Sequence, residues 1–195
     1  QHILANQCLN HTVEEYKNGL LYDTERDASL VERLRRIMLR TVWAITEQMK
    51  LGQFDTVDSE VSFRMDKEKQ TYIGRVDRID TMETEENIYV KIVDYKTGMK
   101  DLSLSDLYYG LQLQLMVYLR AAVDKQTRRS KKMVIPAGVL YYHIEDPFVT
   151  SRLDFEEKRT YLLNELLMRG LVNEEDPVLP SLDATLAGEE GTLAA

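Results

Sequence analysis

The stretch from Ile88 to Gly98 is the feature that most constrains this sequence. Its first part, Ile88–Val93, is rich in Val, Ile and Tyr, which is typical of a β-strand. Side chains alternate between the two faces of a strand, and apolar residues occupy both faces here. We therefore expect a central strand that is covered on both sides. Its end places Asp94 and Lys96 next to one another on the same face.

This acid and lysine allow two interpretations. Burying a charge is costly unless the charge is paired or binds a metal. Asp94 and Lys96 could form a structural ion pair that caps the end of the strand. Alternatively, they could belong to a site that performs chemistry, and residues elsewhere in the chain must decide between the two.

A second strand pattern, Thr71–Asp80, favours the chemical interpretation because it also ends in acids. The polar segment Thr81–Asn87 follows it, as expected of a hairpin loop. An antiparallel pair joined by this loop would bring Asp77 close to Asp94 and Lys96. Metal-assisted phosphodiester hydrolysis needs such a set, because carboxylate oxygens hold Mg²⁺ and a cation stabilises the developing charge.

Three segments carry a family resemblance. In chain order they are Gly74–Asp80, Asp94–Gly98 and Gln114–Tyr118. Together they resemble the PD-(D/E)XK nuclease superfamily. Within it they are most similar to the C-terminal nuclease domain of the AddB/RecB type, which bacterial ATP-dependent helicase–nucleases carry. The upstream patterns Gly52–Phe54 and Glu60–Phe63 also fit that group.

The resemblance implies roles for individual residues. Asp77 and Asp94 would bind Mg²⁺, for which Mn²⁺ could substitute, and the Tyr95 backbone carbonyl would be a further oxygen ligand. Lys96 would position or activate the attacking water and stabilise negative charge in the transition state. Glu60 is a further candidate ligand because the family often carries an acid there, although a solvated glutamate explains its polar neighbours nearly as well.

Gln114 and Tyr118 are expected one turn apart on a helix that runs from Ser103 to about Asp124. The same apolar stripe would contain Leu111, so the Gln114 amide would need partners. One account is a core glutamine bonded to the backbone. The account that the resemblance implies, and that we favour for Gln114, is a side chain that reaches the active site. For Tyr118 a catalytic and a core role are equally supported.

The function implied by the resemblance is a metal-dependent DNA exonuclease domain of a helicase–nuclease that acts in double-strand-break repair and recombination. Its partners would be DNA and an AddA-like helicase subunit. The alternatives are a non-catalytic nuclease-like scaffold or DNA-binding module, or a phage-type or CRISPR-associated exonuclease. The acid–acid–lysine set argues against the scaffold, and the Gly52–Phe54 and Glu60–Phe63 patterns favour the helicase–nuclease type.

Two departures from the family predict that the isolated chain is inactive or weakly active. Relatives carry a histidine in a Gly-x-x-x-His-like context, which neither His2 nor His11 has, so we expect that residue upstream of Gln1. Relatives of the AddB type also hold an iron–sulfur cluster on four cysteines. Cys8 is the only cysteine of this chain and cannot build that cluster alone.

Composition sets wider limits. With 195 residues and 44% hydrophobic content, the chain can form one core. A net charge of −8 argues against a protein that coats nucleic acid, although Lys125–Lys132 is locally basic and is typical of a solvated loop or a phosphate contact. The sequence shows no run of apolar residues long enough to span a membrane, and a single cysteine suits a reducing cytoplasm.

The expected order of elements is a helix, three strands, a helix, a strand and a helix. This order predicts an α/β fold with a mixed central sheet flanked by helices, as in the restriction-endonuclease-like core that the resemblance implies. We expect an N-terminal helical segment over residues 1–55, the nuclease core over 56–172 and a loose tail over 173–195. Pro136 should mark an edge or a bulge, and Gly170 should end the last helix.

Overall fold

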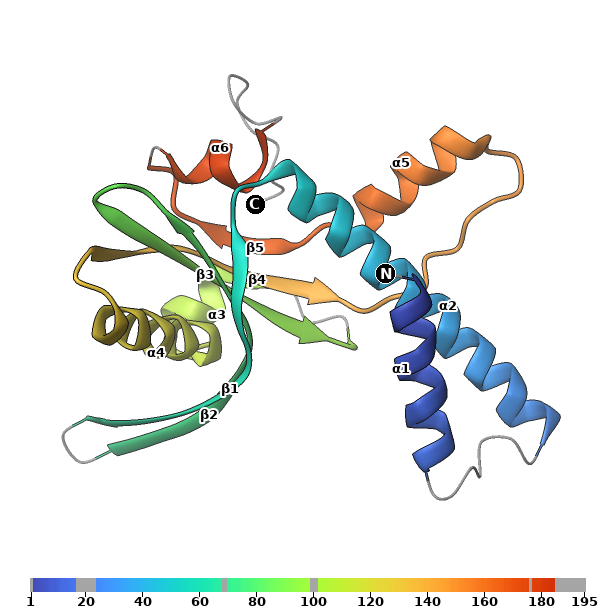
Figure 1. Ribbon diagram of the computed structural model, residues 1–195, viewed down its shortest axis with the longest axis horizontal. Coiled ribbons are helices and arrows are strands. Elements are labelled where there is room, and N and C mark those ends of the chain that lie inside the picture. Colours follow the sequence, from blue (N-terminus) through green and yellow to red (C-terminus); the bar gives the residue numbers. More distant parts are fainter. Residues whose placement is uncertain (1, 17–23, 68–69, 99–101, 176, 185–195) are drawn as a thin grey trace. The chain divides into compact units, whose positions relative to one another are not determined.

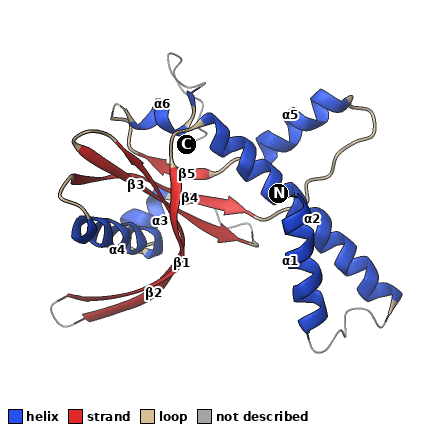
Figure 2. Cartoon of the chain, in the orientation of Figure 1, coloured by secondary structure: helices blue, strands red, loops and turns tan. Residues whose placement is uncertain are grey.

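The computed structural model describes residues 2–16, 24–67, 70–98, 102–175 and 177–184. Its elements are α1 (His2–Glu15), α2 (Glu25–Leu51), β1 (Asp55–Lys67), β2 (Gln70–Glu83), β3 (Asn87–Lys96), α3 (Leu104–Tyr108), α4 (Gln114–Arg129), β4 (Met133–His143), α5 (Phe155–Glu165), β5 (Arg169–Val172) and α6 (Val178–Leu182) (Figures 1 and 2). The chain forms two compact units. One combines residues 1–47 with 144–167, and the other combines 48–143 with 168–195.

The second unit is built on a five-stranded sheet in the order β1-β2-β3-β4-β5. Strands β3 and β4 are parallel, and the other neighbours are antiparallel. A parallel pair needs a crossover connection, and the segment with α3 and α4 supplies it (Figure 1). Strand β3 is central and buried from Ile88 to Asp94. The predicted α/β fold with a mixed sheet flanked by helices is confirmed.

The two faces of this sheet carry separate apolar clusters. Alternate β3 residues Ile88, Val90 and Ile92 pack with α4 on one face. On the other face, Tyr89 packs with side chains that precede β1 and lie in α6. The first cluster includes Val76, Ile79, Leu115, Ala122, Val139 and Tyr141, and the second includes Phe54, Met82, Ala137 and Val178. Helix α4 is therefore fixed over the face to which Asp94 and Lys96 belong.

A buried charged network lies on β2 and β3. The Arg78 guanidinium donates to both carboxylate oxygens of Asp80, each at 2.7 Å, and Asp80 is fully buried. The Lys91 ammonium lies 3.5 Å from the same carboxylate, and the Thr56 hydroxyl donates to it at 2.8 Å. Paired, hydrogen-bonded charges are the form in which buried charge is tolerated. We call these residues, Arg78, Asp80 and Lys91, the buried network.

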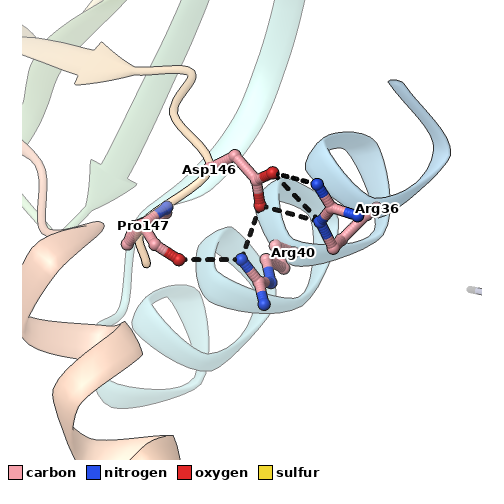
Figure 3. A network of polar contacts seen from close by, with 4 residues as sticks. All are labelled: Arg36, Arg40, Asp146 and Pro147. Carbon is pink, nitrogen blue, oxygen red and sulfur yellow. Dashed lines mark hydrogen bonds and ion pairs between the residues drawn. The ribbon is translucent and has the colours of Figure 1, made fainter. Parts of the chain in front are cut away.

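The first unit contains α1, α5 and most of α2, and the carboxylate of Asp146 is a focus of its polar contacts. Arg36 and Arg40 of α2 both donate to Asp146, with closest distances of 2.5 Å (Figure 3). Arg40 also donates to the Pro147 carbonyl at 3.0 Å. The hydrogen bond and charge of Arg36 lower the pKa of Asp146. These arginines are paired with an acid, which is the structural role that a charged helix face usually has.

The prediction of one continuous helix over residues 103–124 is wrong, because the structure has two separate helices there. Ser103 caps α3, so a helix does begin where it was expected, but α3 ends at Tyr108 and α4 begins at Gln114. Gly110 lies between them with φ of 75°, a conformation that glycine adopts without steric cost. Leu111 is 72% exposed, so the predicted apolar stripe does not form and Gln114 is exposed rather than set in it. The basic run 125–129 is helical, not a loop.

Gly170 does not end a helix. Helix α5 begins with the capping box that Asp154 and Glu157 form, but it ends at Glu165. Gly170 lies instead in β5, where a Cβ would be 2.0 Å from the Val139 carbonyl oxygen. Its lack of a side chain lets β5 approach β4 closely, and this short strand was not predicted.

The loose tail expected from residue 173 is also wrong over α6. Val178 of that helix is fully buried against Phe54, and the backbone N–H of Gln53 donates to the Ser181 carbonyl at 2.7 Å. Residues 185–195 lie outside the described part of the chain.

The bulge predicted at Pro136 is confirmed. Val90 pairs with Pro136 and Lys91 with Gly138, so Ala137 is an extra residue in β4. The bulge accommodates a residue that has no backbone N–H to donate. At the N-terminus, α1 covers His2–Glu15 of the helical segment expected over residues 1–55, and residues 17–23 lie outside the described part.

Candidate active site

The candidate site forms where β2 and β3 separate. Strand β2 pairs with β3 only from Arg78 onward, although it pairs with β1 along nearly its whole length (Figure 1). Asp77 is the first residue of β2 beyond the paired region. Its Oδ2 accepts a hydrogen bond from the Tyr95 N–H at 2.9 Å. This carboxylate therefore replaces the backbone carbonyl that would accept from this N–H in a continued strand pair. The hairpin therefore does bring Asp77 beside the end of β3, as the sequence predicted.

Asp94 and Lys96 form a close ion pair at this point. Asp94 is only 3% exposed, and the Lys96 Nζ lies 2.5 Å from its Oδ2. The ammonium also lies 5.4 Å from the ring centroid of Tyr141, within cation–π distance. Partial burial acts to lower the pKa of Lys96, but the hydrogen bond and charge of Asp94 outweigh it, so the pKa is raised. The charge of Asp77 acts in the same direction, so Lys96 is a persistent cation.

Helix α4 brings Gln114 to Asp94 and Tyr118 to Gln114. The Gln114 Nε2 donates to Asp94 Oδ1 at 3.4 Å and to the Tyr118 hydroxyl at 3.0 Å. The Tyr118 ring packs edge-on against Phe63, with centroids 5.6 Å apart. A Cβ at Gly74 would lie 2.9 Å from the Phe63 ring and 3.0 Å from the Tyr118 ring. A glycine at position 74 therefore leaves room for Tyr118 and, through it, supports the position of Gln114.

Comparison with protein families assigns the whole chain rather than single residues. A family model described as the PD-(D/E)XK nuclease superfamily matches residues 3–188. The chain belongs to this superfamily. The resemblance inferred from its sequence motifs is thereby confirmed, and the five-stranded mixed sheet with flanking helices is consistent with the restriction-endonuclease-like fold. PD-(D/E)XK nucleases typically use divalent metal ions.

Two curated relatives of this PD-(D/E)XK chain are much longer proteins, each the B subunit of an ATP-dependent helicase/deoxyribonuclease. The chain is 40% identical over 192 residues to the relative from Lachnoclostridium phytofermentans, and the match covers 98% of this chain and 16% of the relative. It is 35% identical over 204 residues to the relative from Alkaliphilus oremlandii, with 98% and 18% covered. The chain thus spans less than a fifth of the length of these relatives.

Glu60 of the PD-(D/E)XK chain is placed differently from the two aspartates. In the register of β1 and β2 it falls opposite Asp77, between Ser59 and Val61, but its carboxylate pairs with Arg75 at 2.8 Å. Its φ of 52° is uncommon for a residue with a side chain. Within the described ranges, no three or more His, Cys, Asp or Glu side chains gather as a ready metal-binding group. A ligand role for Glu60 stays a prediction.

Two residues of β4 near the site were not predicted as site residues. The parallel register sets Tyr141 beside Asp94 and His143 beside Lys96. The Nδ1 of His143 is 3.0 Å from the Gly98 carbonyl oxygen, which anchors the segment that follows Lys96. Burial raises the pKa of Tyr141, opposed by Lys96. The available signal was the period of two, which puts residues 141 and 143 on one face of β4.

The donor set at the site fits a hard divalent ion. Asp77 and Asp94 offer carboxylate oxygens, and Mg²⁺ is usually bound through one or two carboxylates while it keeps several waters. Lys96 balances one of the two negative charges, so the trio retains negative charge that a cation would balance. Asp77 and Asp94 are the residues of this site that could hold such an ion.

Proposed function

We propose that this chain is the metal-dependent DNA-hydrolysing domain of a helicase–nuclease, and that it acts as an exonuclease in double-strand-break repair and recombination. One observation carries the proposal: Asp77, Asp94 and Lys96 converge at the end of β3, with Lys96 paired to a buried Asp94. The deoxyribonuclease named in the relatives supports DNA as the substrate. In this proposal, helicase work belongs to other parts of such a protein and to an AddA-type partner subunit.

Asp77 and Asp94, with the Tyr95 carbonyl, would hold Mg²⁺, for which Mn²⁺ would substitute. When bound, the ion supplies polarisation of the phosphate and a lower pKa for a coordinated water. The chain itself supplies fixed positions for the ligands. The Tyr95 N–H holds Asp77, and Lys96 and Gln114 hold the two oxygens of Asp94. Such preorganisation avoids reorientation of the ligands during the reaction.

Lys96 would act as a cation rather than as a proton acceptor. Its raised pKa keeps the ammonium protonated at neutral pH. A protonated amine can orient the attacking water through its hydrogen bonds and can stabilise the negative charge that develops on the phosphate. Gln114 would position Asp94, and Tyr118 would position Gln114 through the hydrogen bond between them.

The cellular setting is part of the same proposal. We place this nuclease in the cytoplasm, where a DNA-repair enzyme meets its substrate. None of the helices in the described ranges is long and apolar enough to cross a membrane. Cys8 is an exposed free thiol on α1, so the iron–sulfur cluster that the family resemblance implies would need cysteines beyond this one.

The test is hydrolysis of end-labelled single-stranded DNA with Mg²⁺ or Mn²⁺. Replacing Lys96 with Ala should lower the rate by at least about 100-fold, the effect of removing one preorganised charge-stabilising group. Lys50→Ala, at an exposed lysine in the last turn of α2, is the matched control and should cleave like the unaltered chain. Equal cleavage by the Lys96→Ala variant would contradict the assignment. A folded chain that binds divalent cations but cleaves no DNA would point either to the inactivity expected of the isolated chain or to the scaffold alternative.

A further inference from the structure

A groove between the β1–β2 hairpin and α4 lies outside the residues assigned to hydrolysis. Its volume is about 380 Å³, and its apolar lining includes Phe63, Met65 and Val76. This volume is near the lower end of the roughly 300–1,000 Å³ range of ligand pockets. The groove therefore fits a short segment of a flexible chain better than a folded partner.

The lining of the groove is basic in a chain that is acidic as a whole. Four basic side chains line it, against one acid, Asp124. They are Arg64, Lys125, Arg128 and Arg129. The one acid is already engaged, because Arg120 lies 3.0 Å from its carboxylate. Since the whole chain has a net charge of −8, this local excess of positive charge points to an anionic ligand.

The carboxylates nearby leave part of this positive charge unbalanced. Asp58 Oδ2 alone accepts both Lys125, at 3.0 Å, and Arg129, at 2.9 Å. Arg64 pairs with Asp66 at 3.3 Å, but both side chains are largely exposed, and such surface pairs are weak. Arg128 is exposed and makes no ion pair with any residue in the described ranges. Arg64 and Arg128 are thus available to a ligand that carries repeated negative charges.

The groove is connected to the candidate active site. Phe63 of its lining contacts the Tyr118 ring, and the Tyr118 hydroxyl accepts the Gln114 amide that reaches Asp94. Helix α4 therefore carries the active-site contact in its first turn and the basic groove residues in its last turns. Gln114 and Arg128 are separated by about 21 Å along the helix axis, at 1.5 Å per residue.

We propose that this groove binds the single DNA strand that continues from the scissile phosphate, with phosphates against Arg64 and Arg128 and bases against Phe63 and Met65. The proposal rests on the nuclease function proposed above and adds a route and a strand preference to it. A groove lined by both apolar and cationic side chains suits a strand whose bases are unpaired, because such a strand offers bases as well as phosphates. A duplex keeps its bases inside and presents mainly phosphates.

The test measures binding without metal or cleavage, so it can fail independently of the hydrolysis test. The Kd for fluorescein-labelled oligo-dT is measured by anisotropy in EDTA over a series of KCl concentrations. The proteins are the unaltered chain, Arg128→Ala and the double variant Arg64→Ala/Arg128→Ala. Arg169→Ala is the matched control, because this exposed arginine lies on β5, at the opposite edge of the sheet from β1.

Each cation removed from the groove should weaken binding and reduce the slope of log Kd against log salt by about 0.7, the value for one phosphate contact on a single strand. Arg169→Ala should bind as the unaltered chain does. Equal slopes for the double variant and the unaltered chain, or no binding by the unaltered chain at low salt, would overturn the proposal. A duplex of the same length that binds as tightly as oligo-dT would overturn the preference for an unpaired strand.

Discussion

Two lysines of the same strand show how differently one fold can use a charge. Lys91 and Lys96 both lie on β3. Lys91 shares the carboxylate of Asp80 with a neighbouring arginine, so the buried network sets two cations around one acid. Lys96 pairs with Asp94 and lies within the charge field of Asp77, so the candidate site sets two acids beside one cation. The buried network needs no further cation, whereas the candidate site suits the binding of one.

The pKa values of these lysines move in opposite directions. Burial lowers the pKa of Lys91, and the attraction of Asp80 does not offset it. The pKa of Lys96 is raised, because its burial is partial and is outweighed by Asp94. The surroundings, rather than the residue type, therefore separate the structural lysine from the one that we propose stabilises charge during a reaction.

The largest expected effect on stability comes from the buried network. Replacing Asp80 with Asn should lower the free energy of unfolding by about 3–5 kcal/mol, because two buried cations lose the carboxylate that they share. Urea denaturation measures this change. Asp55→Asn, at an exposed aspartate that begins β1, is the control and should stay within about 0.5 kcal/mol. If Asp77→Asn destabilised the chain more than Asp80→Asn, the division between a structural and a chemical cluster would be wrong.

A smaller effect is expected from Gly74→Ala, which disturbs the candidate site but not the buried network. The added Cβ would press on the rings of Phe63 and Tyr118, so we expect a loss of about 1–3 kcal/mol from overpacking. The displaced Tyr118 should also loosen Gln114 and lower the hydrolysis rate. Gly98→Ala is the matched control, since nothing lies within 4 Å of its added Cβ. Unchanged stability and rate in Gly74→Ala would contradict the support assigned to Tyr118.

The smallest expected effect is on how the free energy of unfolding changes with pH in the alkaline range. The two lysines should contribute slopes of opposite sign. The pKa of Lys96 in the fold lies above its ordinary 10.5, so its stabilisation is present below pH 10.5 and is lost as pH rises through the raised pKa. The pKa of Lys91 lies below 10.5, so the cost of keeping it charged diminishes as pH rises from its folded pKa to 10.5.

Replacing each lysine with Met should remove its own slope. Lys91→Met should flatten a rise in the free energy of unfolding below pH 10.5, and Lys96→Met should flatten a fall above it. Urea denaturation at a series of pH values measures both slopes. The same slope change in both variants would show that the two lysines do not differ in the way described.

The sequence was sufficient to predict the parts of the fold that local patterns determine. Alternation with a period of two and one hairpin loop predicted β2 and β3, and with them the meeting of Asp77 with the end of β3. The break at Gly110 was missed because the apolar spacing continues through it, and glycine can adopt the positive φ without any other sequence signal. Strand β5 has only four residues, too few to show a pattern.

Features that depend on tertiary register could not be read from the sequence. Tyr141 and His143 lie beside the site only because β4 pairs with β3 in one particular register after a long crossover. The basic residues at the end of α4 were visible in the sequence, but the groove that they line requires the hairpin to pack alongside this helix. The positions of the candidate site residues are now described, whereas their roles stay predictions, those of Asp77, Asp94 and Lys96 included.

The most direct test of the central claim is the binding of a divalent cation by the two aspartates. Mn²⁺ binding to the unaltered chain, Asp94→Asn and Asp77→Asn is measured by calorimetry or by electron paramagnetic resonance, with Asp55→Asn as the control. Both site variants should bind at least about 10-fold more weakly, since even an outer-shell partner of a metal has an effect of that size. The control should bind as the unaltered chain does. Unchanged Mn²⁺ binding in Asp94→Asn would contradict the claim that these carboxylates form the metal site.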